Sequence, residues 1–200
     1  MWIDNFNISK YNDICMKAIE NSEVGDYHLV SGVSSYEIDR EFLFKAELKP
    51  LMVRIQECIN EYIRPHEELL KKKILEPSVI SASWFNILGQ GQKVDRHQHV
   101  ESWNDREGSV VSGAYYPYAD KGSAPLIFTF PDGRLIEIPC SSGSMVIFPS
   151  WVDHHTFENQ TDKRITVSFN TVRKSVVLEK FPNSVKEAEE RLRENNEKKI

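Results

Sequence analysis

The sequence contains few cysteines and no long hydrophobic run. Its three cysteines, Cys15, Cys58 and Cys140, lie far apart and form no CxxC pair. This argues against a disulfide framework or a cysteine-rich zinc site and fits a reducing compartment. No stretch approaches the roughly 20 apolar residues of a membrane-spanning helix, and the first residues lack the apolar run of a signal peptide. We therefore expect a soluble, cytoplasmic protein.

The sequence also lacks an excess of basic residues. It has 25 Lys and Arg against 30 Asp and Glu, which gives a net charge of −5 over 200 residues. Such a chain is a poor electrostatic match for phosphate backbones, so nucleic-acid binding is disfavoured as the main role. Hydrophobic residues make up 40% of the chain, which is enough for a folded core and excludes a disordered protein.

The first part of the chain has the pattern of amphipathic helices. Apolar residues recur at helical spacing over residues 11–19 and again over residues 48–63, and Pro65 is expected to end the second helix. Residues 183–200 are rich in helix formers but have little apolar face. We expect them to form a charged C-terminal helix or tail.

From Ser78 onward the pattern changes to short strands. The segments are rich in β-branched and aromatic residues and are separated by turn signals such as GQG, PDG and SSG. The PDG turn predicts a hairpin between LIFTF and RLIEI. Seven or eight such strands are typical of a β-sandwich or barrel, against whose outer side the preceding helices would pack.

Four of the six histidines fall into two clusters within this strand-rich part. In an extended segment, His97 and His99 point to the same side with Cα atoms roughly 7 Å apart. His154 and His155 follow the strand GSMVIFP, which a barrel can bring beside the first pair. Imidazoles bind iron, zinc, copper and nickel, so the clusters predict a metal site. An HxH pair alone is also common as a surface feature.

Five pieces occur in an order that resembles the 2-oxoglutarate/Fe(II)-dependent oxygenases. They are SWFNILGQG, HQH, VSGAYYPY, GSMVIFPSWVDH and RITVSFN. The resemblance is closest to a small group of oxygenase-like proteins common in bacteria and phages. It implies a mainly β fold, a double-stranded β-helix (a cupin-like jelly roll) braced by α-helices. We expect one domain over residues 1–200, with mostly helical support in 1–76 and the barrel in 78–172.

The resemblance also implies a metal site made by an HxD or HxE pair and a later histidine. His97 takes the first place and His154 the last, whereas His99 stands where these enzymes carry a carboxylate. Three neutral imidazoles would leave the site with a charge of +2 rather than +1. We expect His97, His99 and His154 to bind Fe(II). The carboxylates kept in reserve are Glu101, Asp95 and Asp153.

A second set of residues would bind the cosubstrate. In the resembling enzymes an Arg at the place of Arg164 binds the distal carboxylate of 2-oxoglutarate, often with a hydroxyl two residues on, here Thr166. A guanidinium suits this task because its donors match a carboxylate in pairs. Asn86, Tyr116 and Ser112 are further candidates for the cosubstrate pocket. Tyr116 and Ser112 could equally serve only in packing within their strand.

The resemblance implies a dioxygenase that uses Fe(II), 2-oxoglutarate and O2 to hydroxylate an unidentified substrate, with release of succinate and CO2. The substrate would be a small molecule or a peptide, without a membrane partner, and a homodimer is compatible with the sequence. The alternative is a cupin-type metal dioxygenase or isomerase that does not use 2-oxoglutarate. A cupin would add a Glu where Trp103 or Asn104 stands. A jelly roll that binds a ligand without chemistry is a third reading.

Overall fold

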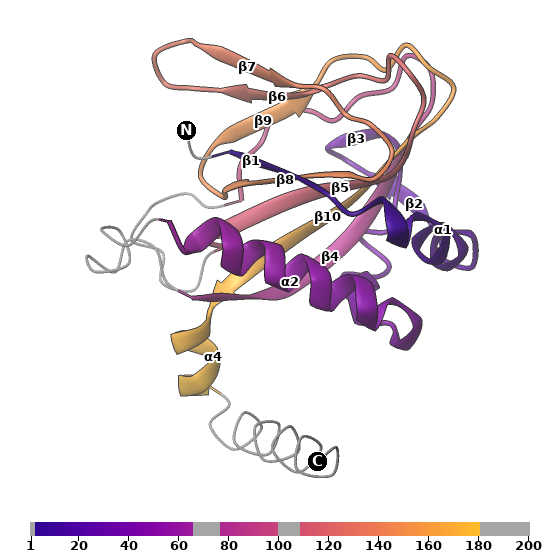
Figure 1. Ribbon diagram of the computed structural model, residues 1–200. Coiled ribbons are helices and arrows are strands. Elements are labelled where there is room, and N and C mark those ends of the chain that lie inside the picture. Colours follow the sequence, from indigo (N-terminus) through magenta and orange to yellow (C-terminus); the bar gives the residue numbers. More distant parts are fainter. Residues whose placement is uncertain (1–2, 66–76, 100–108, 181–200) are drawn as a thin grey trace.

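The computed structural model describes residues 3–65, 77–99 and 109–180, and its main feature is a large antiparallel sheet (Figure 1). The strand order in this sheet is β1-β8-β5-β10-β4-β3-β2, and a second sheet has the order β7-β6-β9. The strands are β1 (Asp4–Asn7), β2 (Gly25–Tyr27), β3 (Val30–Ser34), β4 (Ser78–Leu88), β5 (Val111–Ala119), β6 (Leu126–Thr129), β7 (Leu135–Ile138), β8 (Ser144–Pro149), β9 (Asp153–Thr156) and β10 (Arg164–Arg173).

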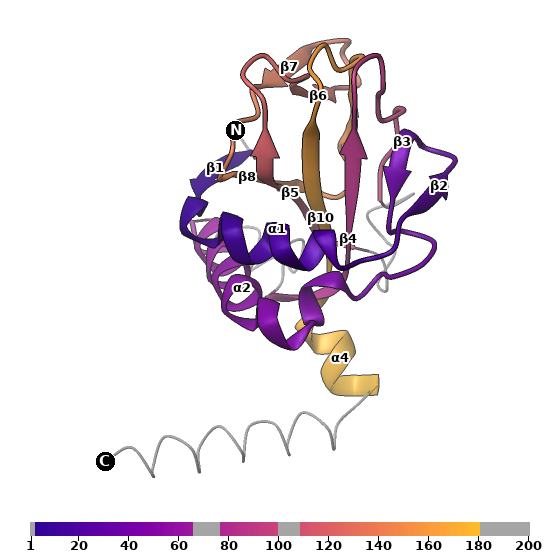
Figure 2. The same cartoon turned by 90° about the vertical axis from the view of Figure 1, so that its right-hand side faces the viewer.

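The two faces of the large sheet have different partners. Helices α1 (Asn12–Glu20) and α2 (Lys49–Ile63) pack on one face, and the three-stranded sheet lies against the other (Figures 1 and 2). Two facing antiparallel sheets with helices outside form the helix-braced double-stranded β-helix that the sequence predicts.

Side-chain alternation along β10 separates the core from the space between the sheets. Ile165, Val167 and Phe169 are fully buried in the cluster that contains the helices. Arg164 and Asn170 lie on the opposite side of the same strand and line a cavity between the two sheets. The period of two that defines a strand therefore gives β10 one apolar face and one polar face.

Most predicted elements are confirmed. The helical patterns correspond to α1 and α2, and the PDG turn joins β6 and β7 as an antiparallel hairpin. Gly133 has a φ of 83° in that turn, a conformation that glycine adopts without steric cost. The chain also forms a short helix, α4 (Lys174–Lys180), after β10. The predicted C-terminal helix or tail at 183–200 lies outside the described residues.

The sequence did not predict strands in the N-terminal part. Residues 1–76 were expected to provide helices, but β1, β2 and β3 extend the large sheet at its two edges. These strands have only three to five residues, too few to show a period of two, and they are stabilised by pairing with distant strands. The described part of this segment, residues 3–65, also contains short 3-10 helices at Ser9–Tyr11, Phe42–Phe44 and Ala46–Leu48.

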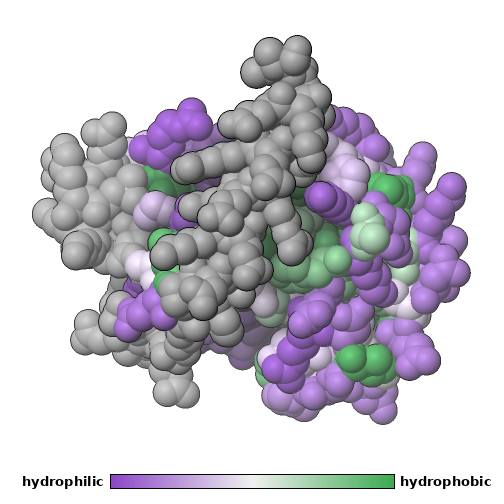
Figure 3. All heavy atoms as spheres, turned by 90° about the horizontal axis from the view of Figure 1, so that it is seen from below, coloured by the Kyte–Doolittle hydropathy of each residue, from purple (hydrophilic) through white to green (hydrophobic). Residues whose placement is uncertain are grey.

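The helices present polar residues outward. In α2, the buried positions Leu51, Ile55, Ile59 and Tyr62 form one stripe toward the sheet, as expected for a helix on a protein surface. Among the coloured residues of the face seen from below, hydrophilic side chains predominate over smaller hydrophobic areas (Figure 3). None of the helices in the described ranges combines the length and apolar character needed to cross a bilayer.

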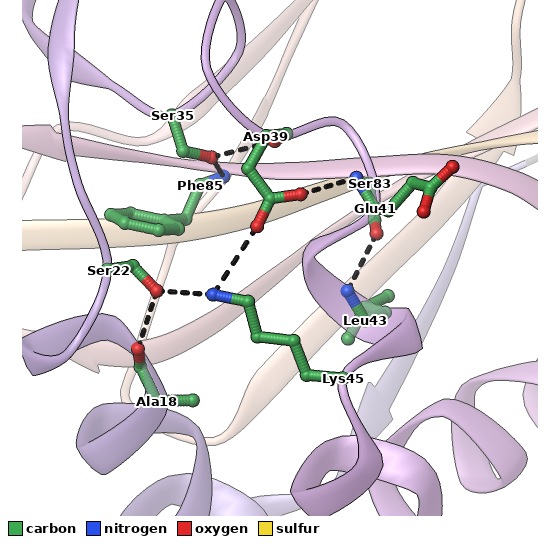
Figure 4. A network of polar contacts seen from close by, with 9 residues as sticks. All are labelled: Ala18, Ser22, Ser35, Asp39, Glu41, Leu43, Lys45, Ser83 and Phe85. Atoms are coloured by element: carbon green, nitrogen blue, oxygen red, sulfur yellow. Dashed lines mark hydrogen bonds and ion pairs between the residues drawn. The ribbon is translucent and has the colours of Figure 1, made fainter.

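A network of polar contacts joins α1 to β4 through the connecting segments (Figure 4). Lys45 donates to the Ser22 hydroxyl over 2.6 Å and pairs with the Asp39 carboxylate at 3.3 Å. The Ser35 hydroxyl donates to the Asp39 carbonyl and accepts a hydrogen bond from the Phe85 backbone N–H over 3.1 Å. Because Ser35 and Phe85 are fully buried, this acceptor cannot readily be replaced by water.

We expect Ser35→Ala to lower the free energy of unfolding by about 1–3 kcal/mol, because it leaves a buried N–H group without its acceptor. Urea denaturation of the metal-free protein measures this. Ser81→Ala is the matched control, since Ser81 also forms a hydrogen bond from β4 but is exposed, and its effect should stay within about 0.5 kcal/mol. Equal effects of the two substitutions would contradict the importance of burial.

Candidate metal centre

Three histidines from two distant segments meet at the mouth of the barrel. His97 and His154 form a mutual backbone pair, in which each N–H donates to the other residue's carbonyl over 3.0 and 2.9 Å. The His99 N–H donates to the carbonyl of Ser150, over 2.9 Å, just before β9 begins. These bonds fix the two segments side by side and place the imidazoles on one side.

The geometry of the cluster suits a single ion. The ring centroids of His97, His99 and His154 are separated by 4.3 to 5.1 Å, and one nitrogen of each ring lies within 4.8 Å of the others. Imidazole nitrogens bind first-row metals at roughly 2.1 Å, so small side-chain movements bring all three onto a common ion. Iron is among the metals that imidazole suits. The donor set therefore fits iron.

The electrostatics of the cluster keep the imidazoles neutral. Desolvation lowers the pKa of His97, and desolvation together with the neighbouring His97 ring lowers the pKa of His99 to about 3. Burial and the two other rings hold the pKa of His154 well below its ordinary value. Because neutral imidazole is the form that binds metals, all three rings are in the ligand state at neutral pH.

Backbone carbonyls orient two of the rings. Nδ1 of His97 lies 2.8 Å from the Asp95 carbonyl oxygen, and Nδ1 of His154 lies 2.9 Å from that of Val152. A carbonyl only accepts, so each Nδ1 carries the hydrogen of the neutral ring and each Nε2 keeps a free lone pair. This arrangement is typical of histidines that bind metals through Nε2.

Arg164 occupies the same cavity as a buried cation. Its side chain is 2% exposed, and it donates to the Ala124 carbonyl over 3.0 Å and to the Thr166 hydroxyl over 2.8 Å. The Tyr116 ring lies 4.9 Å from the guanidinium. No carboxylate within residues 3–65, 77–99 and 109–180 forms an ion pair with it. A buried cation without a counter-charge is costly, so the site is suited to an anion.

The cavity between the sheets has a volume of about 260 Å³ and contains all three histidines and Arg164. Asn86 also lines it, and its Oδ1 is buried without a hydrogen-bond partner in the described structure. Asn86 is the register partner of Thr166 across β4 and β10, which places the two polar side chains next to each other. A buried amide oxygen without a partner and a neighbouring hydroxyl are typical of a site that holds a polar ligand.

The remaining predicted residues lie elsewhere. Ser112 does not line the cavity, because its hydroxyl is bonded to Ser150 and Asn170 behind His99. Asp95 is exposed and pairs with Lys93 at 2.9 Å, and Asp153 pairs with Arg96. Neither carboxylate belongs to the metal-binding group found in the described residues, which contains histidines alone. Glu101 lies outside the described residues.

One wall of the cavity is aromatic, a feature that the sequence did not predict. The rings of Tyr27 and Tyr36 stack at 4.3 Å, and the Tyr36 ring meets that of Trp84 edge-on at 4.9 Å. All three line the cavity, and Trp84 lies 6.0 Å from His99. Trp84 stands in one of the motifs, but nothing near Tyr27 and Tyr36 indicated a site. They come from the unpredicted β2–β3 hairpin and the segment after it.

Comparisons with known proteins agree with this geometry. Residues 130–170, which include His154 and Arg164, match a family described as "Putative 2OG-Fe(II) oxygenase". No protein with a curated description matches the sequence. The fold is similar to a Pseudomonas putida prolyl-4-hydroxylase, with 15% identity, a TM-score of 0.62 and coverage of 86% of this chain and 92% of that one.

Two further solved structures share the fold. The non-heme alpha ketoglutarate-dependent carbocyclase SnoK from nogalamycin biosynthesis has 9% identity and a TM-score of 0.65, with 86% of this chain and 79% of that chain covered. A viral collagen prolyl hydroxylase from Paramecium Bursaria Chlorella virus-1 has 11% identity and a TM-score of 0.55, with coverage of 86% and 96%. Residues 130–170 are thus similar to this oxygenase family, and the fold as a whole is similar to that of enzymes described as prolyl hydroxylases and an alpha ketoglutarate-dependent carbocyclase.

Proposed function

We propose that the chain hydroxylates a small-molecule or peptide substrate, with His97, His99 and His154 binding Fe(II) and Arg164 binding the distal carboxylate of 2-oxoglutarate. The observation that carries this proposal is a single cavity that contains three neutral imidazoles and a buried guanidinium without an ion-pair partner among the described residues. Bound iron and 2-oxoglutarate would supply the oxidation by O2, which inserts one oxygen atom into a substrate C–H bond and leaves succinate and CO2.

The residues around Arg164 prepare it for a carboxylate. The Ala124 carbonyl and the Thr166 hydroxyl accept hydrogen bonds from Nε and one terminal nitrogen, so the guanidinium plane is fixed before the ligand arrives. The other terminal nitrogen has only a long contact, 3.5 Å, to the Tyr116 hydroxyl. The side-chain nitrogen of Asn86, which lines the same cavity, would donate a further hydrogen bond to the carboxylate. Preorganised donors of this kind gain affinity because little ordering remains to be done.

We assign the opposite end of the cavity to the substrate. Trp84 is the register partner of Ser168, which lies four residues along β10 from Arg164, a separation of roughly 13 Å. The aromatic wall of Tyr27, Tyr36 and Trp84 therefore lies away from the guanidinium, beside His99. Aromatic faces favour apolar and ring-bearing groups. The prolyl hydroxylases to which the fold is similar act, by their names, on prolyl residues, which carry such a ring.

Calorimetry under anaerobic conditions tests the function. We expect 2-oxoglutarate to bind Fe(II)-loaded protein with a 1:1 stoichiometry and to bind metal-free protein much more weakly, because the ion and Arg164 hold its two ends. Glutarate serves as the control ligand, since it has the same chain length and both carboxylates but no keto group. If 2-oxoglutarate does not bind, or binds equally well without metal, the proposal is wrong.

A cupin-type enzyme that does not use 2-oxoglutarate is not favoured. The matched family and the similar structures are 2-oxoglutarate-dependent oxygenases, and such a cupin has no evident need for an uncompensated Arg164 inside the barrel. The same calorimetric experiment separates the two, because only the oxygenase requires 2-oxoglutarate.

A further inference from the structure

His99 differs from the other two histidines in what faces its Nδ1 atom. His97 and His154 each place Nδ1 against a backbone carbonyl, whereas Nδ1 of His99 lies 3.4 Å from the side-chain amide of Asn170. A carbonyl fixes the ring hydrogen on Nδ1, but an amide group offers either an acceptor or a donor. The tautomer of His99 therefore depends on how Asn170 is oriented.

The amide of Asn170 has two orientations that fit the same space. In one, Nδ2 faces His99 and Oδ1 accepts a hydrogen bond from Ser112 over 2.8 Å. In the reversed orientation, Oδ1 accepts the Nδ1–H of His99 and Nδ2 donates to Ser112. Only the reversed orientation leaves the lone pair of His99 on Nε2, as in His97 and His154.

The hydroxyl groups behind Asn170 accommodate the reversal. Ser112 and Ser150 are 2.8 Å apart, Ser150 and Ser109 are 2.7 Å apart, and Ser109 lies 3.1 Å from the Val111 carbonyl oxygen. Each hydroxyl can rotate, so Ser112 accepts from Asn170 and donates to Ser150, Ser150 donates to Ser109, and Ser109 donates to the carbonyl. Every hydroxyl then has both a donor and an acceptor role, so the reversal leaves no buried group unpaired.

The pairing of β10 with β4 is also irregular at Asn170. The register between β10 and β4 shifts between Asn170 and Thr171, and such irregularities redirect side chains near functional sites. Asn170 stands on the cavity side of β10, the side that also carries Arg164.

We propose that Asn170 is a positioning residue that accepts the Nδ1–H of His99 through its carbonyl oxygen and so presents Nε2 of His99 to the metal. It does for His99 what backbone carbonyls do for the two other rings. The proposal rests on the metal-binding role of the three histidines given above. Partners of this kind typically alter metal affinity by about 10–100-fold.

Two substitutions at this position give opposite expectations. Asn170→Ala removes the acceptor, and we expect the affinity for Co²⁺, measured by calorimetry and by the absorption of bound Co²⁺, to fall about 10–100-fold. Asn170→Asp keeps an acceptor for both His99 and Ser112, and its affinity should equal or exceed that of the unaltered protein. Ser168→Ala, on the same side of β10, is the matched control and should not change Co²⁺ affinity.

The outcomes separate this inference from the proposed function. Unchanged affinity in Asn170→Ala, or an equal loss in both variants, overturns the role of Asn170 but leaves the metal site standing. Failure of the unaltered protein to bind Co²⁺ overturns both. Nitrogen-15 NMR of the Zn²⁺-loaded, unaltered protein gives a second test without any substitution. We expect the ring hydrogen of His99 on Nδ1, and a hydrogen on Nε2 would overturn the inference.

Discussion

Arg164→Met is expected to weaken binding of 2-oxoglutarate by roughly 30- to 4,000-fold while metal binding persists. Removing one partner of a buried, hydrogen-bonded charge pair typically costs 2–5 kcal/mol, which corresponds to that range. Methionine fills a similar elongated space without the charge. Calorimetric titration of 2-oxoglutarate into the Fe(II)-loaded variant gives the affinity, and titration of the apo variant with Co²⁺ reports on the metal site.

Two comparisons make the result specific. Arg164→Lys keeps the charge but not the paired donors. We therefore expect its affinity for 2-oxoglutarate to lie between those of the Met variant and the unaltered protein. The Met variant should also remain folded, because it removes a buried cation that forms no ion pair with any carboxylate in the described part of the chain. If the Met variant bound 2-oxoglutarate as tightly as the unaltered protein, Arg164 would have no part in the cosubstrate site.

His154→Ala is expected to reduce metal affinity by more than about 100-fold and to abolish succinate formation. The loss should exceed that caused by changing a partner of a ligand, because one of only three nitrogen donors in the cluster disappears. Its backbone pair with His97 does not depend on the side chain, so the two segments should stay together. Co²⁺ calorimetry and release of succinate from 2-oxoglutarate measure the two effects.

The adjacent residue provides the control. His155 is half-buried near the Phe157 ring and does not belong to the three-histidine cluster. His155→Ala should therefore leave Co²⁺ affinity unchanged. Equal losses in the two variants would show that the region responds to any disturbance and not to the removal of a ligand.

The part of the site that the sequence predicted depends on local regularities. The spacing of His97 and His99 in an extended segment placed both rings on one side, and the two-residue step from Arg164 to Thr166 placed them on one face of β10. The order of the motifs then indicated that His154 would join the first pair. Short-range periodicity was sufficient for the first two inferences, whereas the third depended on the order of motifs that resembles a known family.

The part that could not be predicted depends on contacts between distant segments. Tyr36 reaches the cavity because the short strands β2 and β3 pair at the edge of the sheet beside β4. Asn170 faces His99 because the register of β10 brings it there. Ser112 was expected to face the cosubstrate, but its hydroxyl turns to Ser150. No periodic pattern in a single sequence carries such information.

Apolar and polar side chains alternate along β10, so the core and the site depend on the same strand register. The apolar residues Ile165, Val167 and Phe169 alternate with the polar side chains that serve the cavity. A slip of one residue against β4 or β5 would turn the guanidinium into the helical layer and an isoleucine toward the histidines. Misaligned chains would thus be unstable as well as inactive. In every correctly folded chain, Arg164 therefore faces the cavity.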